Sequence, residues 1–494
     1  MMIPLGPFQL EEEIGAGGMG EIWRATHQTT GVPVAIKVIK GEASEEFKDA
    51  FLHEVRLVAG LRHRNVVMAL DAGTISSAAT TASEGRLTAG APYLAMELAG
   101  GGSLSGKRIE SYRELRHVLV QLFDGLAHAH ARGIVHRDIK PGNLLLATER
   151  GRAAGEPDSL LTSRVVVTDF GIGSNREGRD LYEDGAAIGT PNFMAPEQVE
   201  AEWRDHGPWT DLYAAGVLAY QMATGAPPFR AQNAMMTMMA HVTQPVPPLQ
   251  PLFDVPPGFE AFVRQLLAKA PHDRFPFAAD ARRSLMGLGD PVVGTRRAAR
   301  RQNVPAAELP TRIDGLDEDS LITGGAPRPT GLHGGAARPA APAQLPLAAR
   351  WQEEPTRDFL LEGAGLGLYG LRDVPMVARV SERDALWDAL VQVRNTGRAR
   401  VVVLRGPTGT GKSRLVDWLG RVAHEVGAGV TLKAVPGASG RSGALAQLAE
   451  SVLRCDGLER EALLERIDGY LGELGRDGAS EVLAQLIAPD RFPD

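Results

Sequence analysis

The sequence predicts an α+β protein in which a small sheet lobe precedes a larger helical lobe, with a linker and a partial α/β segment behind them. Three observations support this fold class. Strand-like runs come first along the chain, and longer runs with helical spacing follow to about residue 287. From about residue 288 to 372 the regular patterning stops, and it resumes only near residue 373.

The sheet and the helices are expected at defined places. The helical run 113–133 has apolar side chains at Leu115, Leu119, Leu122 and Leu126, and Gly133 ends it. A second helix is expected after Ser44, which suits the N-cap position. The strand-like runs are "FQLEEEI", "VPVAIKVI" and "PYLAMEL".

Composition limits the class of protein. The chain has 494 residues, which suggests two to four domains, and 44% of them are hydrophobic. With 53 basic and 60 acidic residues the formal net charge is -7, which argues against nucleic acid as a partner. A single cysteine, Cys455, excludes an intramolecular disulfide framework. No signal peptide and no membrane span are recognisable, so we expect a cytoplasmic protein.

The glycine motif "GAGGMG" at residues 15–20 follows one expected strand and precedes another. This order predicts a flap over phosphates rather than a Rossmann turn, which would open a helix. Lys37 lies inside a strand pattern, where a lone charge is unusual. Glu54, on the expected helix, could pair with it and hold its ammonium against phosphate oxygens.

Two further motifs follow in order, "HRDIKPGNLLL" at 136–146 and "VVVTDFG" at 165–171. Asp138 and Asn143 share one short loop, and Asp169 ends a strand. Each of these residues alone is typical of a solvated turn. Together their side chains could meet a hydroxyl group and one or two Mg²⁺ ions, which prefer carboxylate and carbonyl oxygens.

The glycine flap, the strand lysine, the helix glutamate, HRD, DFG and "APE" at 195–197 occur in one order. Residues 8–287 therefore closely resemble the bacterial eukaryotic-like (Hanks-type) protein Ser/Thr kinases. The resemblance implies the bilobal protein kinase fold and an enzyme that transfers the γ-phosphoryl group of Mg-ATP to Ser or Thr hydroxyls of protein substrates. It also implies signal transduction with autophosphorylation.

The resemblance assigns roles to individual positions. Asp138, Lys140, Lys37 and Glu54 would be catalytic, and Asn143 with Asp169 would bind Mg²⁺. Lys140 favours Ser/Thr over Tyr acceptors. Glu197, Arg274 and Asp211 would be structural supports, and Met96 the gatekeeper. ATP would contact the glycine flap, the strand behind it and the hinge, at Ile14, Gly15, Ala16, Gly17, Gly18, Met19, Gly20, Ile22, Ala35, Lys37, Glu97 and Ala99.

The activation segment departs from the family pattern. Between Ser174 and Thr190 it contains no Ser or Thr, although Arg137 is typical of kinases that are switched on by phosphorylation there. We hypothesise that Glu183 and Asp184, which carry a charge close to that of a phosphate, partly replace it opposite Arg137. A solvated acidic loop is an equally good interpretation.

Two insertions, 74–91 and 148–163, consist mainly of small and polar residues and are expected to be surface loops. Thr80, Thr81 and Ser83 in the first insertion are candidate autophosphorylation sites. The segment 288–372 is rich in Pro, Ala, Gly and Arg and is expected to be a disordered linker. Its Thr311 and Thr356 could attract phosphothreonine-reading partners. Ordinary disordered composition explains them more simply.

The motif "GPTGTGKS" at 406–413 follows the apolar run "VVVL" and predicts a second phosphate loop between a strand and a helix. Gly406, Gly411, Lys412 and Ser413 would bind nucleotide. Residues 373–494 resemble the start of an AAA/STAND-like P-loop ATPase domain, with Arg379 and Glu382 matching its entry motif. The segment looks incomplete, because no acid follows a later apolar strand and the length is short for such a domain.

Two other functions compete with the kinase. In the first, the chain is a nucleotide-responsive signalling switch or scaffold in which the C-terminal P-loop region is the main regulatory element. In the second, it is a pseudokinase scaffold, which the intact catalytic positions disfavour. An effect of a Lys412 substitution on phosphorylation would favour the switch.

Overall fold

The computed structural model describes residues 2–17, 20–39, 45–147, 159–170, 191–201, 203–291, 347, 351, 361–372, 376–435, 443–473 and 478–488. By its internal contacts the chain divides into two units. One combines Met1–Pro291 with Leu347–Asp494, and the other, Val292–Pro346, lies outside the described residues. Within the described ranges, no helix combines the length and apolar character needed to cross a bilayer.

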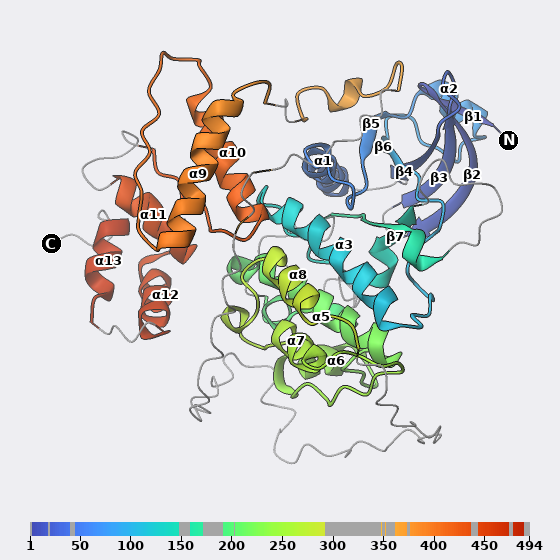
Figure 1. The fold of residues 1–494 in the computed structure, drawn as a ribbon. Helices are drawn as coiled ribbons and strands as arrows, with labels where there is room; N and C mark the ends of the chain where they lie inside the picture. Colours follow the sequence, from blue (N-terminus) through green and yellow to red (C-terminus); the bar gives the residue numbers. More distant parts are fainter. Residues whose placement is uncertain are drawn as a thin grey trace. The chain divides into compact units, whose positions relative to one another are not determined.

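The small lobe is a six-stranded antiparallel sheet with the order β1-β2-β3-β4-β6-β5, drawn in blue in Figure 1. Its strands are β1 (Ile3–Leu5), β2 (Phe8–Gly17), β3 (Gly20–His27), β4 (Pro33–Ile39), β5 (Ala69–Thr74) and β6 (Pro92–Glu97). Strand β4 lies inside the sheet and is buried on both faces. Because side chains alternate along a strand, Lys37 shares its face with Ala35 and Ile39.

Helix α1 (Glu45–Ala59) packs on β5 and β6. Its buried side chains Phe51, Val55 and Val58 belong to one apolar cluster with Ala35 and the large lobe. This spacing of three and four residues places the apolar stripe on one helical face. The expected cap Ser44 lies outside the described residues.

The insertion 74–91 is more ordered than its composition suggests. It contains helix α2 (Ser77–Ala82), whose N-cap Ser76 accepts a hydrogen bond from the Ala79 backbone N–H. Ala79 and Leu87 are buried in the small-lobe core. The expectation of a simple surface loop is therefore wrong here, and Ser83, at 2% exposure, is inaccessible to a kinase in this fold.

The large lobe is mainly helical and follows the sheet lobe in the chain, as the sequence predicts (Figure 1). A short hairpin of β7 (Leu144–Ala147) and β8 (Arg164–Val167) carries the catalytic loops. The α-helices of the lobe are α3 (Tyr112–His130), α4 (Pro196–Val199), α5 (Pro208–Thr224), α6 (Ala234–Thr243), α7 (Phe259–Leu266) and α8 (Ala278–Gly287). The short 3-10 turns of the lobe are η1 (Pro141–Asn143), η2 (Leu160–Thr162), η4 (Pro191–Phe193), η5 (Trp203–Asp205) and η6 (Pro271–Asp273).

Helix α3 confirms the helical pattern found in the sequence. Ser111 caps it by accepting from the Glu114 backbone N–H, and the Glu114 side chain accepts from the Glu110 N–H in return. The four leucines of the predicted stripe are fully buried. Beyond the helix, Gly133 adopts φ 74°, a left-handed conformation that suits glycine and stops the helix.

The described part of residues 376–488 contains five helices and no strand. They are α9 (Val380–Thr396), α10 (Lys412–Glu425), α11 (Gly443–Leu453), α12 (Arg460–Glu473) and α13 (Ser480–Ile487). The expected strand at "VVVL" is wrong: residues 401–404 have no regular structure, and Val401 is 91% exposed. A strand needs a neighbour to pair with, and the described residues of this region offer none.

The end of the predicted linker also differs from the expectation. Residues 361–372 include the short turn η8 (Leu366–Leu368), which contacts β5, and Leu368 is fully buried. The sequence pattern of this stretch suggested disorder, yet Leu361, Leu368 and Leu371 pack into the apolar clusters of the kinase region. The remaining extent of the disordered linker stays a prediction.

Candidate active site

Lys37 lies at the centre of the cleft side of β4, opposite Ile22 of β3 and Leu94 of β6. Its Nζ is 3.5 Å from Oε2 of Glu54 and 2.8 Å from Oδ1 of Asp169. Lys37 and Glu54 are 7% and 2% exposed. The structure thus brings together three of the residues expected to act on ATP, from a strand, a helix and a loop.

Electrostatics decides the charge of this lysine. Burial alone lowers the pKa of Lys37, but the carboxylates of Asp169 and Glu54 outweigh burial and raise that pKa above its ordinary value. Lys37 therefore carries its charge at neutral pH. Burial raises the pKa of Glu54, which lies deeper than Asp169 and farther from the ammonium.

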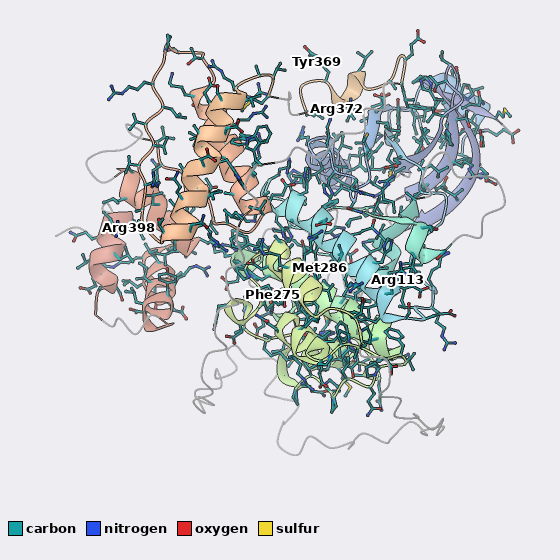
Figure 2. The ribbon with its side chains drawn as sticks, in the orientation of Figure 1. Arg113, Phe275, Met286, Tyr369, Arg372 and Arg398 are labelled. Atoms are coloured by element: carbon teal, nitrogen blue, oxygen red, sulfur yellow. The ribbon has the colours of Figure 1, made fainter. Side chains whose placement is uncertain are left out.

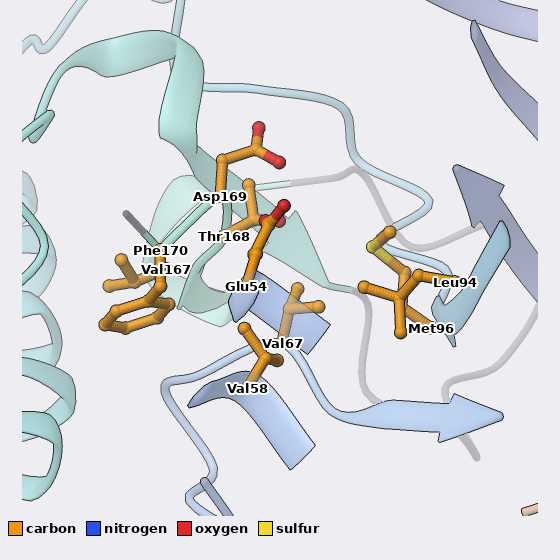
Figure 3. Close-up of a pocket in the computed structure, with 9 residues that line it drawn as sticks. All are labelled: Glu54, Val58, Val67, Leu94, Met96, Val167, Thr168, Asp169 and Phe170. Atoms are coloured by element: carbon orange, nitrogen blue, oxygen red, sulfur yellow. The ribbon is translucent and has the colours of Figure 1, made fainter. Parts of the chain in front are cut away.

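Asp169 follows β8 and adopts φ 61°, a left-handed conformation that is unusual for a residue with a side chain. The backbone at Thr168 is fixed on both sides: its N–H donates to the Asn143 carbonyl at 3.0 Å, and its carbonyl is 2.8 Å from Nε2 of His136. Figure 3 shows the Asp169 and Glu54 carboxylates directed to the same side of a pocket. The strained backbone places this carboxylate toward Lys37.

Behind these carboxylates the pocket is apolar. Met96, the expected gatekeeper, is 6% exposed and lies opposite Ala35 in the sheet register. Figure 3 shows Met96 and Leu94 lining the pocket from β6. The other lining residues are Glu54, Val58, Val67, Val167, Thr168, Asp169 and Phe170. This apolar wall keeps the Lys37–Glu54 pair away from bulk water.

The catalytic loop around Asp138 is held by its own side chains. Lys140 Nζ lies 2.7 Å from Oδ2 of Asp138, and the Asn143 amide nitrogen donates to the same carboxylate oxygen at 3.0 Å and to the Asp138 carbonyl at 2.7 Å. Because Asn143 uses its nitrogen for these contacts, its amide oxygen is left as a ligand atom. The loop thus presents a carboxylate, an ammonium and an amide oxygen together.

Asp211, in the first turn of α5, supports the catalytic loop through hydrogen bonds to its backbone. Its carboxylate is fully buried and accepts from the backbone N–H groups of His136 and Arg137 at 2.8 and 2.7 Å, and it lies 2.8 Å from Nε2 of His130. Burial opposes the charge of Asp211, but the bonds from His130 and the His136 N–H lower its pKa below the ordinary value. A charged Asp211 therefore fixes the backbone just before Asp138.

A second support joins Glu197 of α4 to Arg274, which follows the turn η6. Arg274 donates from Nη1 and Nη2 to the two oxygens of Glu197 at 2.7 and 2.9 Å, and both residues are almost fully buried. Thr210 donates to the same carboxylate at 2.8 Å. This bidentate geometry is the strong form of an ion pair.

The described residues of the glycine motif end β2 and begin β3. Gly15 and Gly17 of β2 pair with Ile22 and Gly20 of β3. A Cβ at Gly20 would lie 2.0 Å from the Val38 carbonyl, so only glycine permits this close crossing. Ala16 pairs within the same hairpin, whereas Gly18 and Met19 lie outside the described residues.

The expected hinge follows β6. The backbone N–H of Glu97 donates to the Met68 carbonyl at 2.9 Å, and the Glu97 side chain is bound by Arg164. Sequence reasoning missed Arg164. Arg164 begins the apolar run of β8 and is 5% exposed, but no short sequence pattern connects it to Glu97. Ala99 lies just beyond and is partly buried, and Ile14 of β2 is 47% exposed.

Most of the residues expected to regulate the site lie in parts of the chain that the structure does not describe. Glu183, Asp184 and Thr190 lie in the segment 171–190, which the structure does not describe. Arg137 is present, and its Nε has no hydrogen-bond partner among the described residues. Thr311 and Thr356 of the linker are also outside the described residues.

The second phosphate loop is arranged differently. Gly411 caps α10 in a left-handed conformation, so that the helix begins at Lys412 as the motif predicts. Lys412 Nζ donates back to the carbonyls of Gly406 and Pro407 at 2.9 and 2.7 Å. Ser413 follows on the exposed first turn. Without the expected strand, this loop has no sheet behind it in the described residues.

Comparisons with known proteins identify the family of the region that contains the first site. The model of the protein kinase domain matches residues 8–283 of the 494. The chain is 34% identical over 311 residues to the serine/threonine-protein kinase PknA of Mycobacterium tuberculosis, which covers 62% of this chain and 64% of PknA. It is 32% identical over 393 residues to Pkn1 of Myxococcus xanthus, covering 74% of this chain and 53% of Pkn1.

A third relative is PknH of Mycobacterium tuberculosis, at 30% identity over 320 residues, which covers 62% of this chain and 46% of PknH. The chain thus spans about half to two thirds of the length of these curated relatives. The family match covers both lobes and all the residues that meet around Lys37 and Asp138. The chain belongs to the protein kinase family.

Proposed function

We propose that this chain is a protein Ser/Thr kinase that transfers the γ-phosphoryl group of Mg-ATP to hydroxyl groups of protein substrates. The observation that carries the proposal is the contact of Lys37 with Asp169 at 2.8 Å. The residue before Asp169, Thr168, bonds to the Asn143 carbonyl of the loop in which Lys140 and Asn143 hold Asp138. These residues come from distant parts of the chain. Their meeting in one cleft is the arrangement that phosphoryl transfer requires.

The donor atoms suit the cofactor. Asn143 offers an amide oxygen and Asp169 a carboxylate, and Mg²⁺ prefers oxygen ligands while taking its remaining ligands from water and phosphates. Among the described residues no cluster of three or more acidic, His or Cys side chains could hold a metal by itself. Bound Mg-ATP would supply the transferred group and the charge that neutralises it.

The protein's own residues then have separate tasks. Lys37 is held charged by two carboxylates and would contact the phosphates with its ammonium. Asp138 would orient the acceptor hydroxyl and accept its proton, and Lys140, 2.7 Å from Asp138, would stabilise the oxygens of the transferred group. We propose Ser or Thr acceptors, because the resemblance to the Ser/Thr kinases includes a lysine at position 140.

Regulation belongs to the same proposal. Arg137 has a buried Nε without a partner among the described residues, next to the catalytic Asp138. An acidic group from the activation segment would pair with it, and we propose Glu183 and Asp184 for this role. Replacing both by Gln and Asn should lower activity, and unchanged kinetics would refute this part.

One experiment tests the main proposal. The purified full chain is incubated with Mg²⁺, labelled ATP and a mixture of protein acceptors, and the phosphorylated residues are mapped. We expect label on Ser and Thr only, including sites on the chain itself, and loss of labelling in Asp138→Asn. Labelling of tyrosine, or equal labelling by Asp138→Asn, would contradict the proposal.

A further inference from the structure

Residues 361–372, which follow the linker, lie against the outer strand of the small lobe. Strand β5 is the last strand of the sheet, so one of its edges has no partner strand. The turn η8 contacts this strand. Figure 2 labels Tyr369 and Arg372 on this stretch. We call residues 361–372 the strap.

The strap satisfies polar groups that β5 leaves open. A shift in the β5–β6 register at Leu70 interrupts the pairing between Ala69 and Asp71. Arg372 Nη2 donates to the carbonyls of Ala69 and Leu70 at 3.0 and 3.1 Å. An edge strand with unpaired carbonyls is a natural site for such donors.

The buried carboxylate of Asp71 gives the strongest reason why the strap binds at β5. Asp71 is 5% exposed, and its Oδ1 accepts from the backbone N–H groups of Gly365 at 2.9 Å and Gly367 at 3.3 Å. Its only other contact given by the described residues is a long one, 3.5 Å, from the Tyr93 hydroxyl. A buried carboxylate is costly unless it is hydrogen-bonded, so β5 needs these two donors.

Shape and packing fit equally closely. A Cβ at Gly367 would lie 1.6 Å from the Ala72 carbonyl, so the contact tolerates only glycine there. Leu368 is 0% exposed and belongs to the apolar cluster that includes Phe51 and Val55 of α1. Leu361 joins the other small-lobe cluster at 9% exposure.

The far end of the strap is fixed by a buried histidine. His27 Nδ1 accepts from the Thr30 backbone N–H at 3.3 Å, so its Nε2 carries the proton and donates to the Glu362 carbonyl at 2.8 Å. The strap therefore spans the lobe from β3 to β5. None of its contacts within the described residues reaches the glycine motif or the catalytic loop.

We propose that the strap is a docking segment in cis that activates the kinase domain by holding α1 in the position where Glu54 pairs with Lys37. Helix α1 and the strap pack on the same strand, and Leu368 shares a core with the α1 stripe. With the strap docked, Lys37 reaches both carboxylates. The activating role rests on the proposed kinase function, whereas the docking of the strap on β5 is independent of that function.

The test uses the full chain with changes in the strap alone, so that no small-lobe residue is altered. Gly367→Ala and Leu368→Ala should release the strap. Leu366→Ala and Tyr369→Ala are matched controls, since these side chains are 80% and 90% exposed on the same segment. Phosphorylation rate and hydrogen exchange of the α1 amides are measured for all four.

We expect a roughly tenfold lower phosphorylation rate and faster α1 exchange for the two releasing variants, and wild-type behaviour for the controls. A synthetic peptide of residues 361–372 added to Leu368→Ala should restore both readouts, and the same peptide with Leu368→Ala should not. Restoration in trans separates a docking role from general destabilisation.

Three results would overturn the proposal. These are equal behaviour of all four variants, a higher rate in the releasing variants, and loss that the peptide does not restore. If the wild-type chain transfers no phosphate, the kinase proposal fails, and α1 exchange alone then decides the docking. Unchanged exchange in Gly367→Ala would refute it.

Discussion

The chain has two glycine-rich motifs suited to phosphate, and they are built in opposite ways. The motif at residues 15–20 lies between β2 and β3 of a six-stranded sheet, and its neighbour Lys37 is 7% exposed between two carboxylates. The motif at 406–413 follows an exposed, irregular stretch, and Lys412 bonds to carbonyls of its own loop. The second motif is the more specific sequence pattern, yet among the described residues only the first is accompanied by a lysine paired with acidic side chains.

The comparison teaches that a phosphate loop acts through the groups around it. A lone loop offers backbone N–H groups and one ammonium, whereas the kinase cleft adds a paired lysine, a general base and oxygen ligands. The predictions below test whether chemistry and stability follow that difference.

The largest effect is expected on the phosphorylation rate, from substitution of the lysine that serves each motif, Lys37 for the first and Lys412 for the second. Lys37→Ala removes the ammonium that faces Glu54 and Asp169, so we expect phosphorylation to fall roughly 10²- to 10³-fold or more. Lys412→Ala should leave the rate unchanged. Both are measured with labelled ATP, with circular dichroism to confirm folding. A large loss in Lys412→Ala would place the C-terminal loop in the catalytic circuit.

A smaller effect is expected on stability from ion pairs of the two regions. Arg274→Ala leaves the buried carboxylate of Glu197 without its bidentate partner, which should cost about 3–5 kcal/mol of unfolding free energy. Arg379→Ala breaks a pair between exposed side chains at 2.6 Å from Glu382, and there we expect little change. Denaturant unfolding of both variants compares them. Equal losses would show that burial does not distinguish the pairs.

The smallest effect is a pH dependence that one buried histidine of the kinase region contributes. Burial and then Lys269 lower the pKa of His241 from 6.5 to about 4 in the folded protein, where its Nδ1 lies 2.9 Å from the Tyr213 hydroxyl. Below pH 6.5 His241 therefore binds a proton in the unfolded chain, whereas in the folded chain it stays neutral until about pH 4. Unfolding free energy should fall by about 2 kcal/mol from pH 7 to pH 5 through this group.

The matched variant His241→Gln should lose that part of the pH dependence and keep the rest. Denaturant unfolding at several pH values measures the difference between the two proteins. A variant with the same slope as the wild type between pH 7 and pH 5 would contradict the assignment to His241.

Much of the kinase region could be predicted because its signals are local. The leucine spacing and the Ser111 cap specify α3, and the short, nearly continuous apolar run around Lys37 specifies β4. The residues of the cleft could be named in order from their motifs. Arg164, bound to Glu97, could not, because its partner lies 67 residues away and no short pattern connects them.

The C-terminal predictions were weaker for the same physical reason. "VVVL" has the composition of a strand, but a strand forms only when other strands accept its hydrogen bonds, and this is a property of the surrounding chain. The strap shows the reverse case. Its glycine-rich sequence suggests disorder, and it becomes ordered because β5 offers open carbonyls and a buried carboxylate.

The sequence alone determined the order of the elements, the helical and strand patterns of the kinase region and the chemical types of its site residues, because each depends on residues close together in the chain. Only the tertiary structure decided that Lys37 meets Asp169, which lies 132 residues away, and that Leu368 enters the core. Burial and charge pairing act between segments that the chain brings together only on folding.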